Sequence, residues 1–294
     1  EIAGVLCYEA LRGTPKALDE RIHAAKAHPE QQQAAQLMRD MLSGSELCEK
    51  HAGDKVQDSC LLRAMPQVHA SIRRLVGEAQ TAIVEEMHSI SDNPEIFAEG
   101  ADDGVALMSG NFDGSFVGAH ADMISMACAI IGKVVERGTD RMVNRNLNDG
   151  LPAFLVAEPG LNNGMMIPQY VAAGLVNEIK LLAIPASIDS IPTCAGQEDP
   201  VSMAYYASKK AQACVRKLQY VTAIEIYTAL QATDFLKPET PSPAIAKVRD
   251  FLRQTIPFVD NDRFLYPDIE YIFDRVRDCT LTDLVEEEIG ELAF

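Results

Sequence analysis

The chain has 294 residues, of which 47% are hydrophobic and 23% charged, which is enough to bury a sizeable core. Its 43 acidic and 26 basic side chains give a net charge of -17, which argues against nucleic acid, because phosphate binding needs clustered Lys and Arg. No apolar run approaches the roughly 18 to 20 residues that span a bilayer, and no signal segment is seen, so we expect a cytoplasmic protein without a membrane partner.

The first residues already have helical character. Residues 2–11 are rich in apolar side chains, and no Ser, Thr, Asp or Asn precedes them. A helix normally begins after one of these capping residues. We therefore expect that the sequence begins inside a larger protein, whose amino-terminal portion is absent from these 294 residues.

Helical spacing of apolar residues predicts two long helices in the first half of the chain. The first covers residues 68–90 and is closed by Pro94, and the second covers residues 116–135. The second is rich in Ala, Met and Ile, as expected for a helix that is buried on most sides. Between them, residues 95–97 and 105–108 flank a Gly/Asp loop and predict a small hairpin.

The second half of the chain predicts four more helical segments. They cover residues 169–184, 201–233, 244–255 and the acidic stretch 268–291. The longest, 201–233, contains neither Pro nor Gly. The sequence has no internal repeat, and we expect an all-α bundle of long helices with one minor hairpin, forming a single helical unit over residues 1–294.

Cysteine and histidine usage does not predict a metal site. The seven cysteines are scattered and contain no Cys-x-x-Cys pair, which argues against a disulfide framework or structural zinc. The six histidines have no spacing typical of metal ligands.

Four short segments carry polar groups that helical packing does not require. They are residues 56–63 with 66–68, residues 109–114, residues 177–180 and residues 197–203. A bundle built from separate helices can gather such groups into one cavity.

Each polar residue also has a structural interpretation. Arg63 either forms an ion pair or binds a substrate carboxylate, which a guanidinium does with two parallel hydrogen bonds. Glu198 is either a charge at a helix amino terminus or a group that contacts the substrate or acts as an acid–base. Gln57 and Asn111 either satisfy buried backbone groups or face a ligand, and Phe112 is either core or pocket wall.

Seven motifs follow one another in a characteristic order. They are residues 21–29 (RIHAAKAHP), Gln57-Asp58 with Leu62-Arg63 and Pro66-Gln67-Val68, residues 91–94 (SDNP), 110–112 (GNF), 151–155 (LPAFL), 185–187 (PAS) and 197–199 (QED). Together they resemble the C-terminal part of the histidine and aromatic amino-acid ammonia-lyase family, closest to the histidine branch. The colinear match runs from Glu1 to about Glu270, which makes it specific.

The resemblance implies a helical fold related to fumarase and aspartase, assembled as a homotetramer. It implies non-oxidative elimination of ammonia from histidine or an aromatic amino acid, giving an α,β-unsaturated acid, as in histidine catabolism. The family's electrophile is a methylidene-imidazolone formed from an internal Ala-Ser-Gly, a tripeptide that does not occur in this sequence. We therefore expect the electrophile on a separate amino-terminal partner chain, and no turnover by this chain alone.

The resemblance also assigns roles to individual residues. Gln57 matches the family's active-site glutamine, and Arg63 matches its carboxylate-binding arginine. Phe112 matches the aromatic residue of the pocket, and Asn111 belongs to the same substrate-binding motif. Glu198 matches the glutamate of the histidine branch, where phenylalanine and tyrosine lyases usually carry glutamine; a carboxylate can bind a ring nitrogen of an imidazole substrate.

Four positions depart from the family pattern. Cys60 stands where the family has a catalytic tyrosine close to the reacting amine. Because a thiol is shorter and titrates lower than a phenol, Cys60 is either an adapted acid–base or the mark of a site that has drifted. Asp113, Ile179 and Pro200 replace residues that are usually His, Asn and His in the histidine branch, which leaves the substrate open.

Three functions remain open from the sequence. The first is a split or cleaved ammonia-lyase that needs an amino-terminal partner, and the second is an aminomutase, which re-adds ammonia at the β-carbon. The third is a non-catalytic or repurposed subunit, motivated by Cys60 and by the missing Ala-Ser-Gly.

Overall fold

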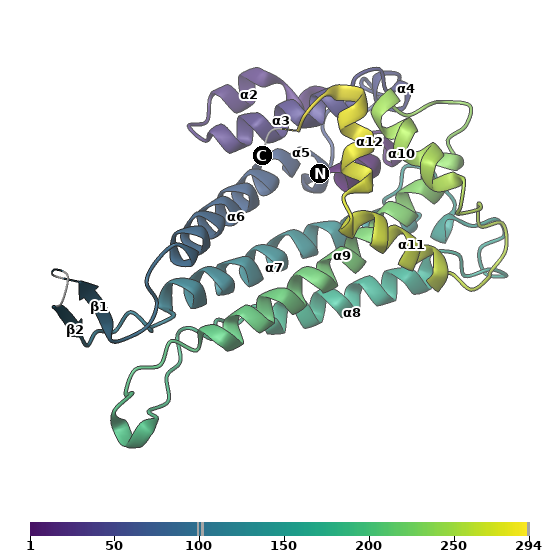
Figure 1. Ribbon diagram of the computed structural model, residues 1–294. Helices are drawn as coiled ribbons and strands as arrows, with labels where there is room; N and C mark the ends of the chain where they lie inside the picture. The colour runs from purple at the N-terminus through teal and green to yellow at the C-terminus, as the bar shows by residue number, and fades with distance from the viewer. Residues whose placement is uncertain (99, 101–102, 293–294) are drawn as a thin grey trace. The chain divides into compact units, whose positions relative to one another are not determined.

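A computed structural model describes residues 1–98, 100 and 103–292 (Figure 1). In chain order, its helices and strands are α1 (Ile2–Ala10), α2 (Glu20–Ala24), α3 (Pro29–Leu42), α4 (Glu46–Glu49), α5 (Cys60–Arg63), α6 (Met65–Met87), β1 (Glu95–Ala98), β2 (Gly104–Leu107), α7 (Ser115–Val143), α8 (Met166–Leu182), α9 (Ala204–Asp234), α10 (Pro243–Arg253), α11 (Tyr266–Arg277) and α12 (Thr280–Ile289). Short 3-10 turns occur at Pro15–Leu18, Ala153–Leu155 and Cys194–Gly196. The predicted all-α fold with one small hairpin is confirmed.

The described residues form two compact units. The first comprises Glu1–Arg73, Ile130–Glu178 and Arg216–Phe294, and the second comprises Arg74–Ala129 and Ile179–Val215. The four long helices α6, α7, α8 and α9 each contribute residues to both units. The expectation of a single helical unit over residues 1–294 stays a prediction.

Three of the long helices are joined by polar contacts inside the first unit. Gln169 on α8 donates to the Asp140 carboxylate on α7 over 2.7 Å, and Lys217 on α9 pairs with Glu178 on α8. Gly138 on α7 lies so close to α9 that a Cβ there would overlap the carboxylate of Glu225. The glycine therefore permits close packing of the two helices.

Helix α7 is long and apolar enough to cross a membrane when judged by length and composition alone. It is the one such helix among the residues that the structure describes, and 44% of its most apolar window is buried inside the protein. The core helix of a soluble protein passes the same test, and the buried Asp122 and Glu136 lie on α7.

The short helices of the first unit surround α1, whose residues 3–10 are all buried. Helix α10 packs against both α12 and α3. Ser242 begins α10 by accepting the Ile245 N–H on its Oγ at 3.4 Å, and its own N–H donates to the buried Glu9 carboxylate of α1 at 2.7 Å. The amino terminus of α10 is therefore capped from two sides.

The predicted acidic helix over residues 268–291 is in fact two helices. Helix α11 ends at Arg277, and Cys279 takes a left-handed φ of 63° before α12 begins. The Asp278 carboxylate accepts from the N–H of Thr280 at 3.1 Å and from its hydroxyl at 2.6 Å. Helical periodicity continued through this break, so the sequence pattern alone did not reveal it.

Candidate functional site

Three of the predicted site residues line a single cavity in the first unit. The cavity has a volume of about 560 Å³, and Gln57, Cys60 and Arg63 contribute to its wall. The other lining residues are Thr14, Lys16, Ala17, Ile22, Val56, Asp58, Ala64 and Gln67. Gln57 and Cys60 are exposed, whereas Arg63 is partly buried.

The segment that carries these residues is anchored by Asp58. This side chain is 5% exposed and accepts the Thr14 N–H on Oδ2 at 2.6 Å and the Lys55 ammonium on Oδ1 at 3.4 Å. Lys55 also donates to the Leu11 carbonyl at 3.2 Å and pairs with Asp149. Asp58 therefore fixes the backbone between Gln57 and Cys60 against the chain that follows α1.

The Thr14 side of this anchor is held in turn by Tyr8. The buried Tyr8 hydroxyl donates to the Thr14 carbonyl at 2.5 Å, and burial, with a smaller contribution from Asp58, raises the pKa of Tyr8 well above its ordinary value. Gly13 lies against the Tyr8 ring so closely that a Cβ at this position would overlap it. The cavity wall at Thr14 is thus rigid.

Helix α5 is a single turn that brings Cys60 and Arg63 together. Ser59 precedes it, and its carbonyl accepts the N–H groups of Leu62 and Arg63, each at 3.1 Å. Residues three apart on a helix face the same side. The Arg63 Nη2 donates to the Cys60 Sγ at 3.3 Å.

The cavity has unused hydrogen-bonding capacity. Within the described part of the chain, Arg63 pairs with no carboxylate, and its buried Nε has no hydrogen-bond partner. The buried Oε1 of Gln67, which also lines the cavity, has no partner among the described residues, and neither does the buried Oγ of Ser59, which precedes α5 and is not part of the cavity wall. Buried polar atoms in native proteins are normally satisfied, so these atoms indicate a site that completes its contacts with a group from outside.

The charge of the cavity favours an anionic ligand. Lys16 and Arg63 both line it, and the acidic Asp58 is engaged with Thr14 and Lys55. A cationic cavity in a chain of net charge -17 suits a carboxylate. Among the described residues, Arg63 does not form the ion pair that its structural interpretation requires.

Asn111 and Phe112 lie in the second unit, in the loop between β2 and α7 (Figure 1). Both are exposed, and 53% of the Phe112 surface is accessible. Asp113 in the same loop accepts the Ser115 N–H at 2.9 Å and so caps the start of α7. Phe112 is not a core residue within its unit.

Glu198 also lies in the second unit, in the loop between α8 and α9. Its carbonyl accepts the Thr193 N–H at 2.9 Å, and its own N–H donates to the Thr193 carbonyl at 3.3 Å. The side chain is exposed, and α9 begins only at Ala204. Glu198 is therefore outside the first turn of α9, so the helix-terminus interpretation does not fit.

The two remaining departures have different environments. Ile179 on α8 is fully buried, so its replacement of a polar residue belongs to the packing of the second unit. Pro200 is exposed in the loop that carries Glu198.

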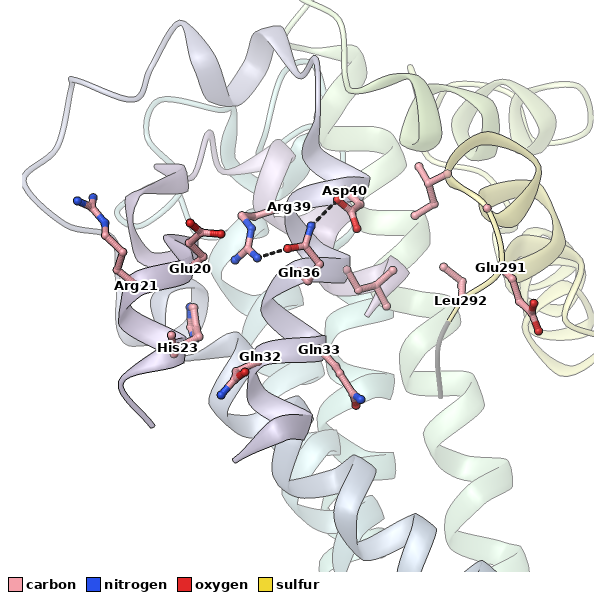
Figure 2. A pocket seen from close by; sticks show the side chains of 14 residues that line it. Glu20, Arg21, His23, Gln32, Gln33, Gln36, Arg39, Asp40, Glu291 and Leu292 are labelled. Carbon is pink, nitrogen blue, oxygen red and sulfur yellow. Dashed lines mark hydrogen bonds between the residues drawn. The ribbon is translucent and has the colours of Figure 1, made fainter. Parts of the chain in front are cut away.

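A second cavity of about 560 Å³ in the first unit contains none of the predicted site residues (Figure 2). Three of its polar side chains bond to one another: Gln36 donates to Asp40 at 2.7 Å and accepts from Arg39. The nearby His23 is 1% exposed, with Nε2 3.0 Å from the Ala17 carbonyl and Nδ1 3.1 Å from Gln31. His23 therefore holds the chain at Ala17, which lines the first cavity together with Ile22 of the same 21–29 motif.

Sequence reasoning missed two contributors to the site. Asp58 stood in the motif with Gln57 but received no role, because its polar neighbours Gln57 and Ser59 gave no sign that it is buried. Lys16 belongs to no motif, and only the fold brings it to the cavity.

The sequence model described as aromatic amino acid lyase matches residues 1–254. The chain belongs to this family. The histidine ammonia-lyase of Sorangium cellulosum (strain So ce56) is 39% identical over 295 residues, covering 99% of the chain and 57% of that protein.

Two solved structures support the lyase fold. The histidine ammonia-lyase of Trypanosoma cruzi superposes with a TM-score of 0.89 at 33% identity, covering 99% of this chain and 54% of the other. The tyrosine aminomutase of Streptomyces globisporus superposes with a TM-score of 0.91 at 30% identity, covering 99% of this chain and 59% of the other. This member of the lyase family thus spans little more than half the length of the relatives it matches.

Proposed function

We propose that this chain supplies the carboxylate-binding part of an ammonia-lyase acting on histidine or an aromatic amino acid. The observation that supports this most directly is the arrangement of Gln57, Cys60 and Arg63 around one cavity of about 560 Å³. A cavity of this size accommodates an amino acid. Membership of the aromatic amino acid lyase family points to the same chemistry.

Arg63 binds the substrate carboxylate in this proposal. Arg63 forms no ion pair among the described residues and its Nη2 bonds only to the Cys60 thiol, so the terminal nitrogens of the guanidinium are available in the cavity. A carboxylate facing these nitrogens receives two parallel charge-assisted hydrogen bonds. This contact fixes the amino acid by the group that does not react and orients its α and β carbons.

Cys60 and Gln57 act next to the amine. The Cys60 Sγ already accepts a hydrogen bond from Arg63, so the sulfur is presented as an acceptor. We propose that the exposed Cys60 acts as the thiolate, its own proton having passed to solvent, and that Sγ accepts a proton from the substrate ammonium group, leaving a neutral amine. The exposed Gln57 amide then holds the amine through a hydrogen bond.

The family's methylidene-imidazolone fits beside these residues, because Gln67 on the cavity wall has a buried Oε1 without a partner among the described residues. Gln57 and Gln67, which both line the cavity, would hold it through their side-chain amides. When bound, this group supplies the electrophile that makes the amine a leaving group. The sequence contains no Ala-Ser-Gly, and we propose that an amino-terminal partner chain carries it.

Glu198, Phe112 and Asn111 select the substrate in this proposal. A glutamate at position 198 favours the imidazole of histidine through a hydrogen bond to a ring nitrogen. The histidine ammonia-lyase of Sorangium cellulosum at 39% identity supports histidine as the first substrate to test. Phe112 supplies an apolar face for the same ring.

An aminomutase is the second candidate. The tyrosine aminomutase of Streptomyces globisporus superposes on 99% of this chain with a TM-score of 0.91. Both reactions need the same carboxylate contact, so Arg63 does not distinguish them. Product analysis does, because an aminomutase returns a β-amino acid, whereas a lyase releases ammonia.

We also propose the family's tetrameric assembly in the cytoplasm. Ile167, Tyr170 and Val171 on α8 are 54%, 70% and 46% exposed and lie on one helical face. Large apolar side chains gathered in this way favour burial against further chains. Light scattering of the purified protein tests the tetramer.

Intact mass spectrometry of the natively purified assembly, joined to an absorbance assay for urocanate and cinnamate, tests the whole proposal. We expect a second, amino-terminal chain whose mass is lower than its sequence mass by the waters lost in cyclisation, together with product. This chain alone without product would leave a lyase fold without lyase chemistry, and a β-amino acid product would favour the aminomutase.

A further inference from the structure

A buried ion pair lies beneath the loop that carries Glu198. Asp122 on α7 and Lys210 on α9 are each 5% exposed, and Lys210 Nζ lies 3.1 Å from Asp122 Oδ1. Both residues belong to the second unit. Removing two charges from water is costly unless both are well bonded, so a buried pair calls for a reason beyond stability.

Both partners of this pair bond to the backbone where the loop begins. Asp122 Oδ2 accepts the N–H groups of Ala186 at 2.7 Å and Ser187 at 2.8 Å, and Lys210 donates to the Ile184 carbonyl. Burial alone would raise the pKa of Asp122, but the hydrogen bonds from Ser187 and Lys210 outweigh it and lower the pKa. Asp122 is therefore a charged anchor that receives three donors.

The rest of the loop has no packing of its own. Every residue from 188 to 200 is exposed in the structure. Its shape comes from internal bonds: the Thr193–Glu198 backbone pair, and the Ser190 hydroxyl, which accepts the Val201 N–H at 2.9 Å. A loop that is held by internal hydrogen bonds but does not pack against other residues moves as one rigid segment about its two ends. Its position therefore depends on the contacts that hold those ends.

We propose that Asp122 and Lys210 are positioning residues that fix the Glu198 loop and thereby set where its carboxylate meets the substrate. The inference rests on the proposed function, in which Glu198 contacts the substrate. Neither member of the pair touches the reacting atoms. They affect catalysis by holding residues 184–187, because the position of these residues sets the position of the loop and of Glu198 within it.

Hydrogen–deuterium exchange tests the anchor without using activity. In the full assembly, Asp122→Asn and Lys210→Met should speed exchange of the Ala186 and Ser187 amides by about tenfold or more, because charge-assisted bonds to these groups are weakened. Ser125→Ala is the matched control on α7, since its buried hydroxyl bonds only to the Ala121 carbonyl. Asp234→Asn breaks another pair of low exposure, with Arg253, away from this loop. Unchanged exchange in the anchor variants, or equal exchange in the controls, overturns the proposal.

Kinetics test whether the anchor acts through Glu198. Asp122→Asn should lower kcat/KM for histidine by about tenfold and shift the preference towards phenylalanine, whereas in a Glu198→Gln background it should change the preference by less than about twofold. Lys210→Arg keeps the positive charge and should retain most of the discrimination between histidine and phenylalanine that Lys210→Met loses. Equal effects in both backgrounds would make the pair merely structural. If Glu198→Gln alone changes nothing, the substrate role of Glu198 fails and the kinetic half of this inference is overturned, while the exchange result still decides the anchor.

Ser190→Ala keeps the test decisive if the anchor variants do not fold. Ser190 is exposed, and its hydroxyl braces the loop without any buried contact. This variant should fold normally and lower discrimination in the same direction but to a smaller extent. A folded Ser190→Ala protein with unchanged discrimination would contradict the transmission along the loop.

Discussion

Arg63 and Cys60 occupy one turn of α5 and are joined by a hydrogen bond of 3.3 Å from Nη2 to Sγ. The two groups proposed to handle the substrate's carboxylate and its amine are therefore fixed relative to each other by a four-residue helix. This helix is held in turn by the buried Asp58. Changes at the two positions should not be additive, because residues in contact share their interaction energy.

Replacement of Arg63 by Ala is expected to reduce kcat/KM by an amount equal to about 2 to 4 kcal/mol, since a charge-assisted, two-point contact is lost. Arg63→Lys retains the charge but not the planar fork and should recover only part of the loss. Arg277→Ala, an exposed arginine paired with Asp274, is the matched control. Steady-state kinetics of the completed assembly measures kcat/KM for each variant. An unchanged kcat/KM in Arg63→Ala would show that Arg63 does not bind the substrate.

Cys60→Ala is expected to lower kcat by roughly 10² to 10⁴-fold, the range for loss of a positioned proton acceptor. Cys279→Ala is the control, because Cys279 is also an exposed free thiol. Cys60→Tyr restores the side chain of the family at this position. A fall in rate would mark the thiol as an adaptation, whereas a large rise would mean that Cys60 is a loss and would contradict the proton-transfer role.

Much of the fold follows from the sequence because periodicity is strong in the long helices. The prediction for residues 201–233 agrees with α9 at Ala204–Asp234, since no Pro or Gly interrupts the pattern. Helix α7 continues to Val143, eight residues past the predicted end at Val135, because polar residues such as Arg137 and Asp140 interrupt the apolar stripe without breaking the helix. The break at Cys279 was missed because it depends on one left-handed residue.

The site was predictable only in part, and for a physical reason. Gln57, Cys60 and Arg63 lie within seven residues of one another, so a local motif places them together. Lys16 reaches the same cavity through the anchoring of Thr14 by Asp58, which no local pattern encodes. The contribution of Glu198 depends on an anchor formed by Asp122 far away in sequence.

Asp58→Ala is expected to lower the free energy of unfolding by about 2 to 4 kcal/mol, because the buried Thr14 N–H and the Lys55 ammonium lose their acceptor. Urea titration followed by circular dichroism measures the loss. Asp54→Ala, which removes an exposed carboxylate from His51, should have little effect. If both variants have the same stability, Asp58 is not the anchor of this segment.

Glu198→Gln is expected to lower kcat/KM for histidine by about tenfold while leaving phenylalanine nearly unchanged, because an amide binds an imidazole nitrogen less strongly than a carboxylate does. Asp199→Asn, the exposed neighbour in the same loop, controls for the loss of one negative charge. Parallel assays with histidine and phenylalanine give the ratio of the two kcat/KM values for each variant. An equal loss for both substrates would contradict a role for Glu198 in selection.

Glu225 is expected to make stability fall as pH rises towards 8. It lies on α9 with 3% of its surface exposed, and burial raises its pKa from 4.5 to about 8. Between these two values the folded state holds a proton that the unfolded state has released. The free energy of unfolding therefore loses up to about 1.4 kcal/mol per pH unit from this group. The contribution is fully present below pH 4.5 and absent above pH 8.

Glu225→Gln removes this dependence while keeping the size of the side chain. The variant should gain stability relative to the parent as pH increases from 5 to 8, with the difference largest at the alkaline end. Urea titrations at several pH values measure the difference in the free energy of unfolding between the variant and the parent. Glu288→Gln, at an exposed position on α12, is the control. A difference that shrinks with rising pH would mean that Glu225 is charged in the folded state and gains stabilisation from a partner.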